Sequence, residues 1–399
     1  MIVMVVNSGS SSLKYQLFDM KTDRVMVKGL CERIGLDGRL THAVPARDPL
    51  MVELRMRNHQ EALEAVMRHL TDGLHGVLRD IRDIGAVGHR IGHGGVYFSD
   101  SVLIDARVKE AIRALFPLAL LHNPPALSCV EACESLFGPT VPQAAVCDTA
   151  FHQTIPRYAY TYSLPRWLTE KHQIRRYGFH GTSHKYVSEQ AAQFLGLDYG
   201  AVNTVVCHLG NGSSVCAVQG GRSIDTSMGF TALEGLVMGT RCGDQDPALA
   251  PFLIQNENLS AAEVEGIFYK ESGLKGLSGL SSDFRDIAEA AAGGHEEAKN
   301  AIEVLAYQIK KYIGAYSAAL GGLDVVAFTG GIGENSPLIR EKSLAGLTRL
   351  GLDLDQEKNQ ACRGQAGLIS ADASPIKILV MPTNEEWVIA HDALELVGA

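Results

Sequence analysis

Apolar and polar positions form the same pattern near the start of the chain and again in its second half. An apolar strand runs into a turn rich in glycine and serine and then into a second alternating strand, over residues 2–18 and again over residues 204–218. A third apolar strand, residues 325–328, runs into the glycine-rich turn 329–335. One such turn alone is as typical of an ordinary β-hairpin as of a phosphate-binding loop. Three of them favour a nucleotide site, because glycine lets backbone N–H groups turn toward phosphate and serine adds hydroxyl donors.

The rest of the pattern mixes strands with helices. It predicts strands over residues 24–30, 83–88, 143–147, 203–208 and 376–381, and helices over residues 60–78, 106–115, 124–137, 184–195, 260–269, 284–292, 295–320 and 385–396. With the repeat, this order predicts an α/β protein of two similarly built lobes with a nucleotide in the cleft between them. We expect residues 1–150 and 385–399 to form the N-terminal lobe, and residues 151–384 the C-terminal lobe with the nucleotide loops.

The amino-acid composition limits the classes of binding partner that the chain can have. The chain has 399 residues, 46% of them hydrophobic and 20% charged, as in a globular protein with substantial cores. Its net charge of −9 argues against a nucleic-acid partner. The apolar stretch 115–121 is too short to span a membrane, and residues 1–6 lack the basic lead of an export signal. We therefore expect a cytoplasmic protein without a nucleic-acid or membrane partner.

The cysteines point to a reducing compartment. All 8 lie outside any C-x-x-C pair, and we expect buried free thiols. Cys129 and Cys133 have helical spacing but no further ligand nearby in the sequence, which disfavours a metal site there.

Three side chains stand where chemistry with anions is expected. Asp148 follows the strand 143–147, where an acid can point into a cleft or serve as a turn residue. Arg90 follows a strand, and Arg241 lies in a loop of small residues. A guanidinium suits both a carboxylate and a phosphoryl oxygen, although an ordinary salt bridge is the alternative for each arginine.

His180 precedes a predicted helix, with Thr182 or Ser183 as the expected N-cap. At that place its imidazole can donate a hydrogen bond to a phosphoryl oxygen. His180 and His184 also have the spacing of a metal-binding pair, but no third ligand accompanies them.

Familiar phosphate motifs are absent. No Gly-Lys dipeptide occurs, so there is no Walker A loop, and protein-kinase signatures are missing. Six segments instead resemble the acetate kinase family, in order and across essentially the whole chain. They are VVNSGSSSLK at 5–14, HRIGHGG at 89–95, LHNP at 121–124, YGFHGTSH at 177–184, MGTRCGD at 238–244 and PTNEE at 382–386.

This resemblance implies the fold of the sugar kinase, heat-shock chaperone and actin superfamily, with duplicated actin-like (ribonuclease H-like) ATPase lobes. It also implies reversible transfer of the ATP γ-phosphoryl group to acetate, giving acetyl phosphate and ADP, with Mg²⁺ as cofactor, Mn²⁺ as a possible substitute, and a homodimer. The acid is already an anion, so the chemistry needs cations that bring two negative groups together in line. An aspartyl-phosphate intermediate is chemically open, but direct in-line transfer is simpler.

The resemblance also implies roles for individual residues. The catalytic residues would be Asp148, His180 and Arg241. The acid would be bound by Arg90, Gly92, Leu121, His122, Phe179 and Ala232. ATP would be bound by Lys14, His208, Leu209, Gly210, Asn211, Gly212, Asp283, Phe284, Arg285, Gly331, Ile332, Gly333, Glu334 and Asn335. Asn7 and Glu385 would hold the metal.

Three positions depart from the family pattern. Gly92 stands where valine is usual, Ala232 where proline is usual, and Leu120 replaces another proline. Gly92 and Ala232 are smaller than the usual residues, so we expect them to leave room in the acid pocket for at least one more methylene group. A propionate kinase or a broad short-chain carboxylate kinase is therefore the close alternative.

Two further classes share the duplicated lobes. A chaperone-type machine would need a peptide-binding domain after the ATPase, whereas this sequence ends at Ala399, just after the last predicted helix. A sugar kinase needs a general-base carboxylate, which Asp148 could supply, but it would leave Arg90 and Arg241 without an anionic acceptor.

Overall fold

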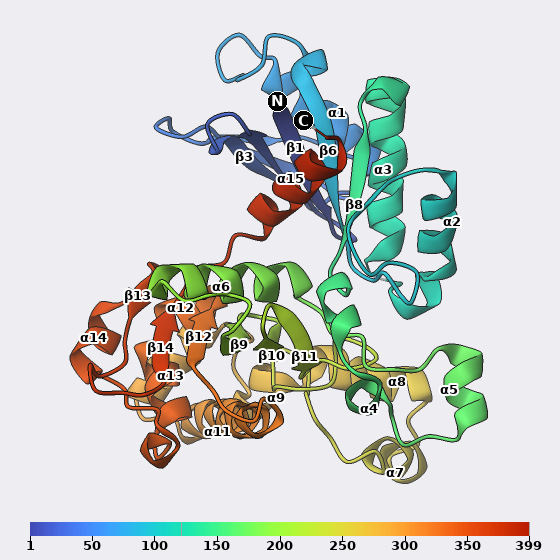
Figure 1. The fold of residues 1–399 in the computed structure, drawn as a ribbon. Helices are drawn as coiled ribbons and strands as arrows, with labels where there is room; N and C mark the ends of the chain where they lie inside the picture. Colours follow the sequence, from blue (N-terminus) through green and yellow to red (C-terminus); the bar gives the residue numbers. More distant parts are fainter. Residues whose placement is uncertain (121, 399) are drawn as a thin grey trace. The chain divides into compact units, whose positions relative to one another are not determined.

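The computed structural model describes residues 1–120 and 122–398. It divides into two compact units, Met1–Ala150 with Asn384–Ala399, and Phe151–Thr383 (Figure 1). Each unit is built on one β-sheet.

The sheet of the first unit has eight strands in the order β5-β4-β3-β2-β1-β6-β8-β7. The strands are β1 Ile2–Ser8, β2 Leu13–Asp19, β3 Arg24–Glu32, β4 Arg39–Ala43, β5 Leu50–Glu53, β6 Ile84–Ile91, β7 Val102–Leu103 and β8 Gln143–Cys147. Strands β1, β2 and β3 form an antiparallel meander. Strand β6 lies parallel to β1, β8 lies parallel to β6, and β7 closes the edge antiparallel to β8.

The six-stranded sheet of the second unit repeats this plan in the order β11-β10-β9-β12-β14-β13. The strands are β9 Asn203–Leu209, β10 Ser213–Gln219, β11 Arg222–Thr226, β12 Val325–Thr329, β13 Gly367–Leu368 and β14 Lys377–Val380. Its first three strands again form an antiparallel meander, two parallel strands follow, and an antiparallel edge strand closes the sheet. The predicted α/β fold with duplicated lobes is therefore confirmed.

Helices cover both faces of the first sheet. They are α1 His59–Leu70, α2 Ala106–Ala114, α3 Asn123–Phe137 and α15 Glu385–Leu396. Met4 and Val6 of β1 face α1 and α3, whereas Val3 and Val5 face α15, as the twofold side-chain period of a strand requires. Figure 1 shows α15, in red, lying against β1 and β6.

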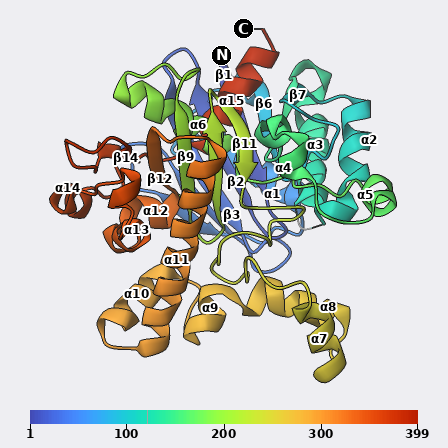
Figure 2. The same cartoon turned by 60° about the horizontal axis from the view of Figure 1, so that its bottom comes forward.

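The second sheet is also covered on both faces. Helix α6, Gly181–Leu195, packs on Val206, Cys216 and Val218. The long helix α11, Glu296–Ala319, packs on the opposite face beside α9, Gly273–Ser278, and α10, Phe284–Ala292 (Figures 1 and 2). The remaining helices are α4 Arg157–Tyr160, α5 Arg166–His172, α7 Leu249–Asn256, α8 Ala261–Gly266, α12 Gly330–Asn335, α13 Pro337–Leu344 and α14 Gln356–Ala361. Short 3₁₀ segments are Ile81–Asp83, Phe116–Leu118, Gly138–Thr140, Ala150–Thr154 and Thr348–Leu350, and Ile267–Glu271 is a π-helical turn.

Two predicted helices end early. The helix expected over residues 60–78 stops at Leu70, because the Asp72 carboxylate accepts hydrogen bonds from the backbone N–H groups of Leu74 and His75 and closes a turn. The helix expected over residues 260–269 stops at Gly266, where the π-helical turn begins.

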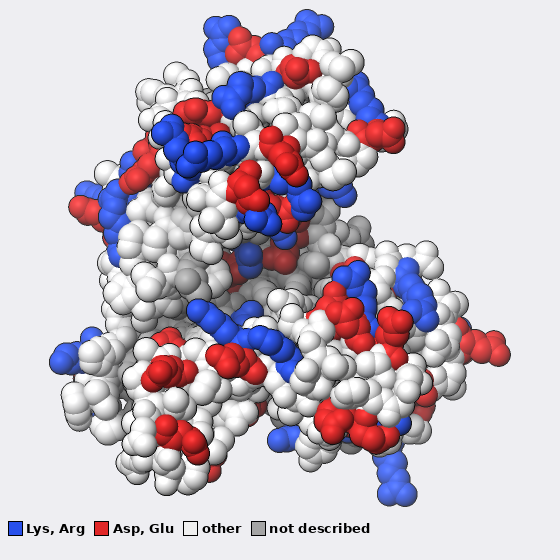
Figure 3. Space-filling view, turned by 180° about the vertical axis from the view of Figure 1, so that it is seen from behind, with Lys and Arg blue, Asp and Glu red and all other residues white. Residues whose placement is uncertain are grey.

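The surface carries charges of both signs. In the view of Figure 3, Lys and Arg side chains are interspersed with Asp and Glu side chains. The 8 cysteines are buried free thiols, as predicted. No helix among residues 1–120 and 122–398 is long and apolar enough to cross a membrane.

Candidate functional site

Predicted site residues of the first unit gather at the carboxyl ends of its parallel strands. Asn7 lies near the end of β1, Arg90 near the end of β6, and Asp148 directly follows β8. Because β1, β6 and β8 are parallel neighbours, their carboxyl ends meet at one edge of the sheet. That edge is where open α/β sheets bind ligands.

Arg90 and Asp148 form a bidentate ion pair. Arg90 Nε lies 2.8 Å from Asp148 Oδ1, and Nη2 lies 2.5 Å from Oδ2. Glu385, the first residue of α15, places Oε2 3.9 Å from Arg90 Nε. Burial disfavours both charges and raises the pKa of the Asp148 carboxyl, an effect that Arg90 opposes. The carboxylates of Asp148 and Glu385 hold the pKa of Arg90 above its usual value despite burial, so its guanidinium stays charged.

The loop after β6 is fixed by Asn123. The side chain of this buried residue accepts a hydrogen bond from His93 N at 3.0 Å and donates one to His93 O at 2.9 Å. The loop thereby brings Gly92 against His122, where a Cβ built on Gly92 would lie 2.5 Å from the His122 Cβ. The space beside Gly92 is therefore filled by a side chain that was itself predicted to contact the acid. Leu121, a further predicted acid-binding residue, lies outside the described residues.

Asn7 and Lys14 face each other across the β1–β2 pair. Both line a pocket of about 270 Å³ that also includes Lys28 and Glu386. No group of three or more His, Cys, Asp or Glu side chains gathers as a metal cage in the described part of the chain. The oxygen donors Asn7, Asp148 and Glu385 nevertheless fit Mg²⁺, which takes one or two carboxylates and completes its shell with phosphates and water.

In the second unit, His180 lies within a cluster of imidazoles. Its ring stacks on that of His208 with centroids 4.3 Å apart, and its Nδ1 lies 2.9 Å from Ser214 Oγ. His208 Nδ1 lies 2.7 Å from Ser183 Oγ. The prediction of Thr182 or Ser183 as the N-cap of α6 is wrong: His180 itself is the N-cap residue, in a left-handed conformation with φ of 57°.

Arg241 joins this cluster through Gly212. A Cβ built on Gly212 would lie 2.9 Å from Arg241 Nη2 and 3.4 Å from His180 Nε2, so glycine lets the two side chains converge on the hairpin tip. Arg241 Nη1 donates to the Ala232 carbonyl at 2.6 Å. Burial lowers the pKa of the Arg241 guanidinium from its usual value, with Tyr269 acting in the opposite direction. No described carboxylate forms an ion pair with Arg241, which leaves its charge available to an anion.

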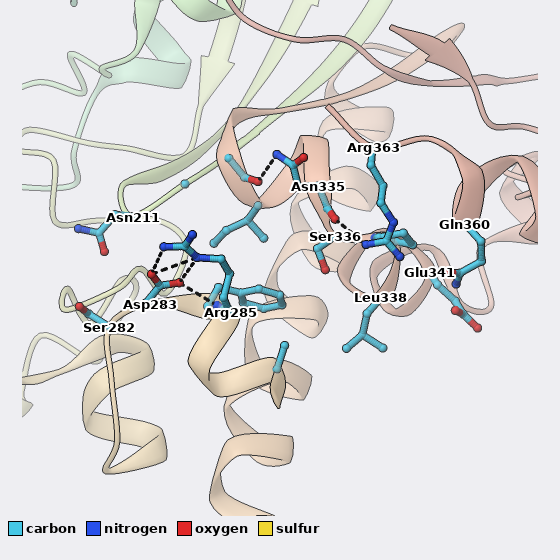
Figure 4. Close-up of a pocket in the computed structure, with 16 residues that line it drawn as sticks. Asn211, Ser282, Asp283, Arg285, Asn335, Ser336, Leu338, Glu341, Gln360 and Arg363 are labelled. Atoms are coloured by element: carbon cyan, nitrogen blue, oxygen red, sulfur yellow. Dashed lines mark hydrogen bonds and ion pairs between the residues drawn. The ribbon is translucent and has the colours of Figure 1, made fainter. Parts of the chain in front are cut away.

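A pocket of about 990 Å³ brings the three predicted nucleotide loops of this unit together (Figure 4). This volume is at the upper end for small-molecule sites. Of the predicted nucleotide residues, Gly210, Asn211, Asp283, Phe284, Arg285, Gly331, Ile332 and Asn335 line it. His208, Leu209, Gly212, Gly333 and Glu334 do not line it.

Glu334 has a different place. Its Oε1 accepts hydrogen bonds from the backbone N–H groups of Gly330 and Thr383, at 2.9 and 3.2 Å, so it braces the loop from within. Arg285 pairs with Asp283, the N-cap of α10, at 2.6 Å, and its side chain is 88% exposed. These two residues therefore form a surface ion pair with each other at the edge of the pocket.

Comparison with known proteins supports the resemblance to the acetate kinase family along the whole chain. The model of the Acetokinase family matches residues 2–391. The chain belongs to the acetokinase family. It is 53% identical over 398 residues to "Acetate kinase" of Heliobacterium modesticaldum, covering 100% of both chains. Its structure superposes on Porphyromonas gingivalis acetate kinase with a TM-score of 0.96 at 43% identity, and on a propionate kinase from Francisella tularensis with a TM-score of 0.92 at 41% identity, each covering 99% of both chains.

In this acetokinase-family chain, the large pocket also includes residues that the sequence did not predict. Arg363, Gln360, Glu341 and Ser336 also line the large pocket, and Figure 4 shows Arg363 beside Asn335, to whose carbonyl its Nη1 donates at 3.2 Å. These residues follow the third glycine turn without a motif of their own. Ser214 was visible in the second hairpin, but its contact with His180 depends on how α6 packs.

Proposed function

We propose that this chain is an acetate kinase that transfers the γ-phosphoryl group of ATP to acetate, reversibly and by direct in-line transfer. The observation that carries the proposal is Arg241, a half-buried guanidinium that pairs with no described carboxylate and converges with His180 on the tip of a nucleotide-type hairpin. A full-length relative named acetate kinase, 53% identical to this chain, supports the choice of acid.

In this proposal, positively charged and hydrogen-bond-donating side chains stabilise the transition state and orient the acid. Acetate is already a nucleophile, so no base must remove a proton. Arg241 and His180 donate to the equatorial oxygens of the transferring phosphoryl group, where charge is concentrated in the transition state. Arg90 orients the acid, and Asp148 positions Arg90 by accepting hydrogen bonds from two of its three donor nitrogens, Nε and Nη2. The resemblance to the family assigns the remaining contacts with the acid to His122, Phe179 and Ala232.

Mg²⁺ would be held by Asn7 and Glu385 and would neutralise phosphate charge. Lys14 would contact the phosphates, and the nucleotide would occupy the pocket of about 990 Å³. The functional lobes 1–150 with 385–399 and 151–384, the use of Mn²⁺, a homodimer and a cytoplasmic location stay predictions.

The test is the forward reaction with purified protein, Mg²⁺ and ATP, in which acetyl phosphate is trapped as its hydroxamate. We expect product with acetate, a lower specificity constant with propionate, and no ADP release stimulated by glucose. Release of ADP with glucose and not with acetate would place the chain among sugar kinases.

Gly331→Leu is expected to weaken ADP binding roughly tenfold or more, about 1.4 kcal/mol. A Cβ at Gly331 meets no heavy atom within 4 Å, so the new side chain fills the pocket without straining the fold. Titration calorimetry with ADP measures the effect. Gly266→Leu on α8 is the matched control, since its Cβ also meets open space and it does not line the pocket. Unchanged ADP affinity in Gly331→Leu would exclude this pocket as the nucleotide site.

Gly92→Ala is expected to raise KM for the acid roughly tenfold with little change in KM for ATP. The added methyl group collides with His122, which must move away from the acid. Kinetics with acetate and propionate measure it. The space expected beside Gly92 is occupied by His122. We therefore expect the ratio of specificity constants for propionate and acetate to change by a smaller factor than the specificity constant for acetate itself. A large shift of that ratio with acetate activity intact would instead show that residue 92 limits the length of the acid.

A further inference from the structure

One serine hydroxyl lies between two imidazoles beside the proposed phosphoryl site. Ser214 Oγ is 2.9 Å from His180 Nδ1 and 2.7 Å from His184 Nε2. A hydroxyl has a single proton, so it can donate to only one of these nitrogens, and at least one of the two nitrogens must carry an N–H that donates to it. The two rings are therefore coupled: where one ring donates to Ser214, the serine proton becomes available to the other ring.

The surroundings of His184 decide which of the two rings donates a hydrogen bond to Ser214. His184 is fully buried, and its Nδ1 has no hydrogen-bond partner in the described part of the chain. Burial, with contributions from His152 and His208, lowers the pKa of His184 well below its usual value, so the ring is neutral and carries one proton. A proton on Nδ1 would be a buried N–H without an acceptor, which proteins avoid more strictly than an unused lone pair. The proton therefore belongs on Nε2, which donates to Ser214.

We propose that His184 and Ser214 form a positioning relay that fixes the proton of His180. His184 Nε2–H donates to Ser214 Oγ, Ser214 O–H donates to His180 Nδ1, and His180 is left with its proton on Nε2. That nitrogen is the one that converges with Arg241 on Gly212. The relay rests on the proposed function, because it gives His180 the donor that a phosphoryl oxygen requires.

The relay also explains the spacing of the two histidines. His180 and His184 are four residues apart, as in a metal-binding pair, and Ser214 reaches from β10 to bond both rings. Phe179, the residue before His180, is positioned by another histidine in a fixed protonation state. His152 Nε2 lies 3.0 Å from the Phe179 carbonyl, which can only accept, so His152 carries its proton on Nε2 while Nδ1 accepts from Ser223 Oγ at 2.8 Å. Burial lowers the pKa of His152 to about 4, which keeps this arrangement neutral.

Nitrogen NMR of the full chain labelled with ¹⁵N-histidine tests the relay without any assay of activity. We expect both His180 and His184 to be neutral rings protonated on Nε2, with signals assigned through His180→Gln and His184→Gln. In Ser214→Ala, the His180 signals should shift toward a mixture of tautomers. A wild-type His180 or His184 protonated on Nδ1 would overturn the relay.

Kinetics supply the second readout. In His184→Gln the side-chain amide can place an N–H near the position of Nε2, whereas the shorter His184→Asn cannot. We expect His184→Asn and Ser214→Ala to lower kcat roughly 10- to 100-fold with both KM values nearly unchanged, and His184→Gln to recover most of the loss. Ser343→Ala, which removes a buried hydroxyl bonded to the Ile339 carbonyl, is the control for a lost buried hydrogen bond. A folded Ser214→Ala enzyme with wild-type kcat would contradict the proposal.

These outcomes separate the relay from the proposed function. If wild-type protein forms no acetyl phosphate, the proposed function fails, and the NMR tautomers still decide the relay. If acetyl phosphate forms and His180 is protonated on Nδ1, only the relay fails.

Discussion

Arg241→Ala is expected to lower kcat for acetyl phosphate synthesis by about 10²- to 10³-fold while the fold survives. Removing one preorganised donor from a transition state costs about 3–4 kcal/mol. Arg241 pairs with no described carboxylate, so its loss leaves no buried charge behind, and its hydrogen bond to the Ala232 carbonyl involves a neutral acceptor. The loss should therefore appear in turnover rather than in stability.

Steady-state kinetics with circular dichroism and thermal unfolding measure this. Arg166→Ala is the matched control, because Arg166 lies in the same unit with its side chain 84% exposed and, among the described residues, forms an ion pair only with Glu170 on α5. A folded Arg241→Ala enzyme with near-normal kcat would remove Arg241 from the chemistry.

Asp148→Asn is expected to abolish most activity and leave ADP binding nearly intact. The amide cannot hold both donor nitrogens of Arg90 with the same charge-assisted hydrogen bonds, so the guanidinium loses its orientation toward the acid. ADP binding should persist, because the described residues that line the pocket of about 990 Å³ all belong to the unit Phe151–Thr383, which does not contain Asp148. Breaking a buried ion pair by removing one partner costs about 3–5 kcal/mol, an upper estimate here since the Arg90 side chain is 24% exposed.

Titration with ADP and thermal unfolding distinguish these effects. The double variant Arg90→Gln/Asp148→Asn is the control for stability, because it removes both charges and should regain part of the lost stability. If ADP affinity falls along with activity in Asp148→Asn, then Asp148 acts on the nucleotide or on the fold and does not act through Arg90.

The central strands of the two sheets were easier to predict from the sequence than the short strands at their edges. The core strands were visible because buried strands such as β1, β8, β9 and β12 are nearly continuous apolar runs. Strands β7 and β13 have two residues each, too few to set a pattern. The end of α1 was missed because apolar positions continue beyond Leu70, whereas the helix is stopped by backbone hydrogen bonds that the Asp72 carboxylate accepts.

The site was predictable one residue at a time but not as contacts. Asp148 could be placed at a strand end from the sequence, yet its pairing with Arg90 requires β8 to lie beside β6, which is a property of sheet order. Gly92 illustrates the same limit. Its small size suggested open space, and only the loop held by Asn123 reveals that His122 fills it. The roles of these residues remain proposals that the variants above test.

The most direct test of the account is ATP synthesis in the reverse direction. Purified protein is supplied with Mg²⁺, ADP and either acetyl phosphate or glucose 6-phosphate, and ATP is followed by luciferase. We expect rapid ATP formation from acetyl phosphate, none from the sugar phosphate, and at least a hundredfold loss of rate in Arg241→Ala. ATP formation from glucose 6-phosphate alone, or a rate from acetyl phosphate that Arg241→Ala does not change, would contradict it.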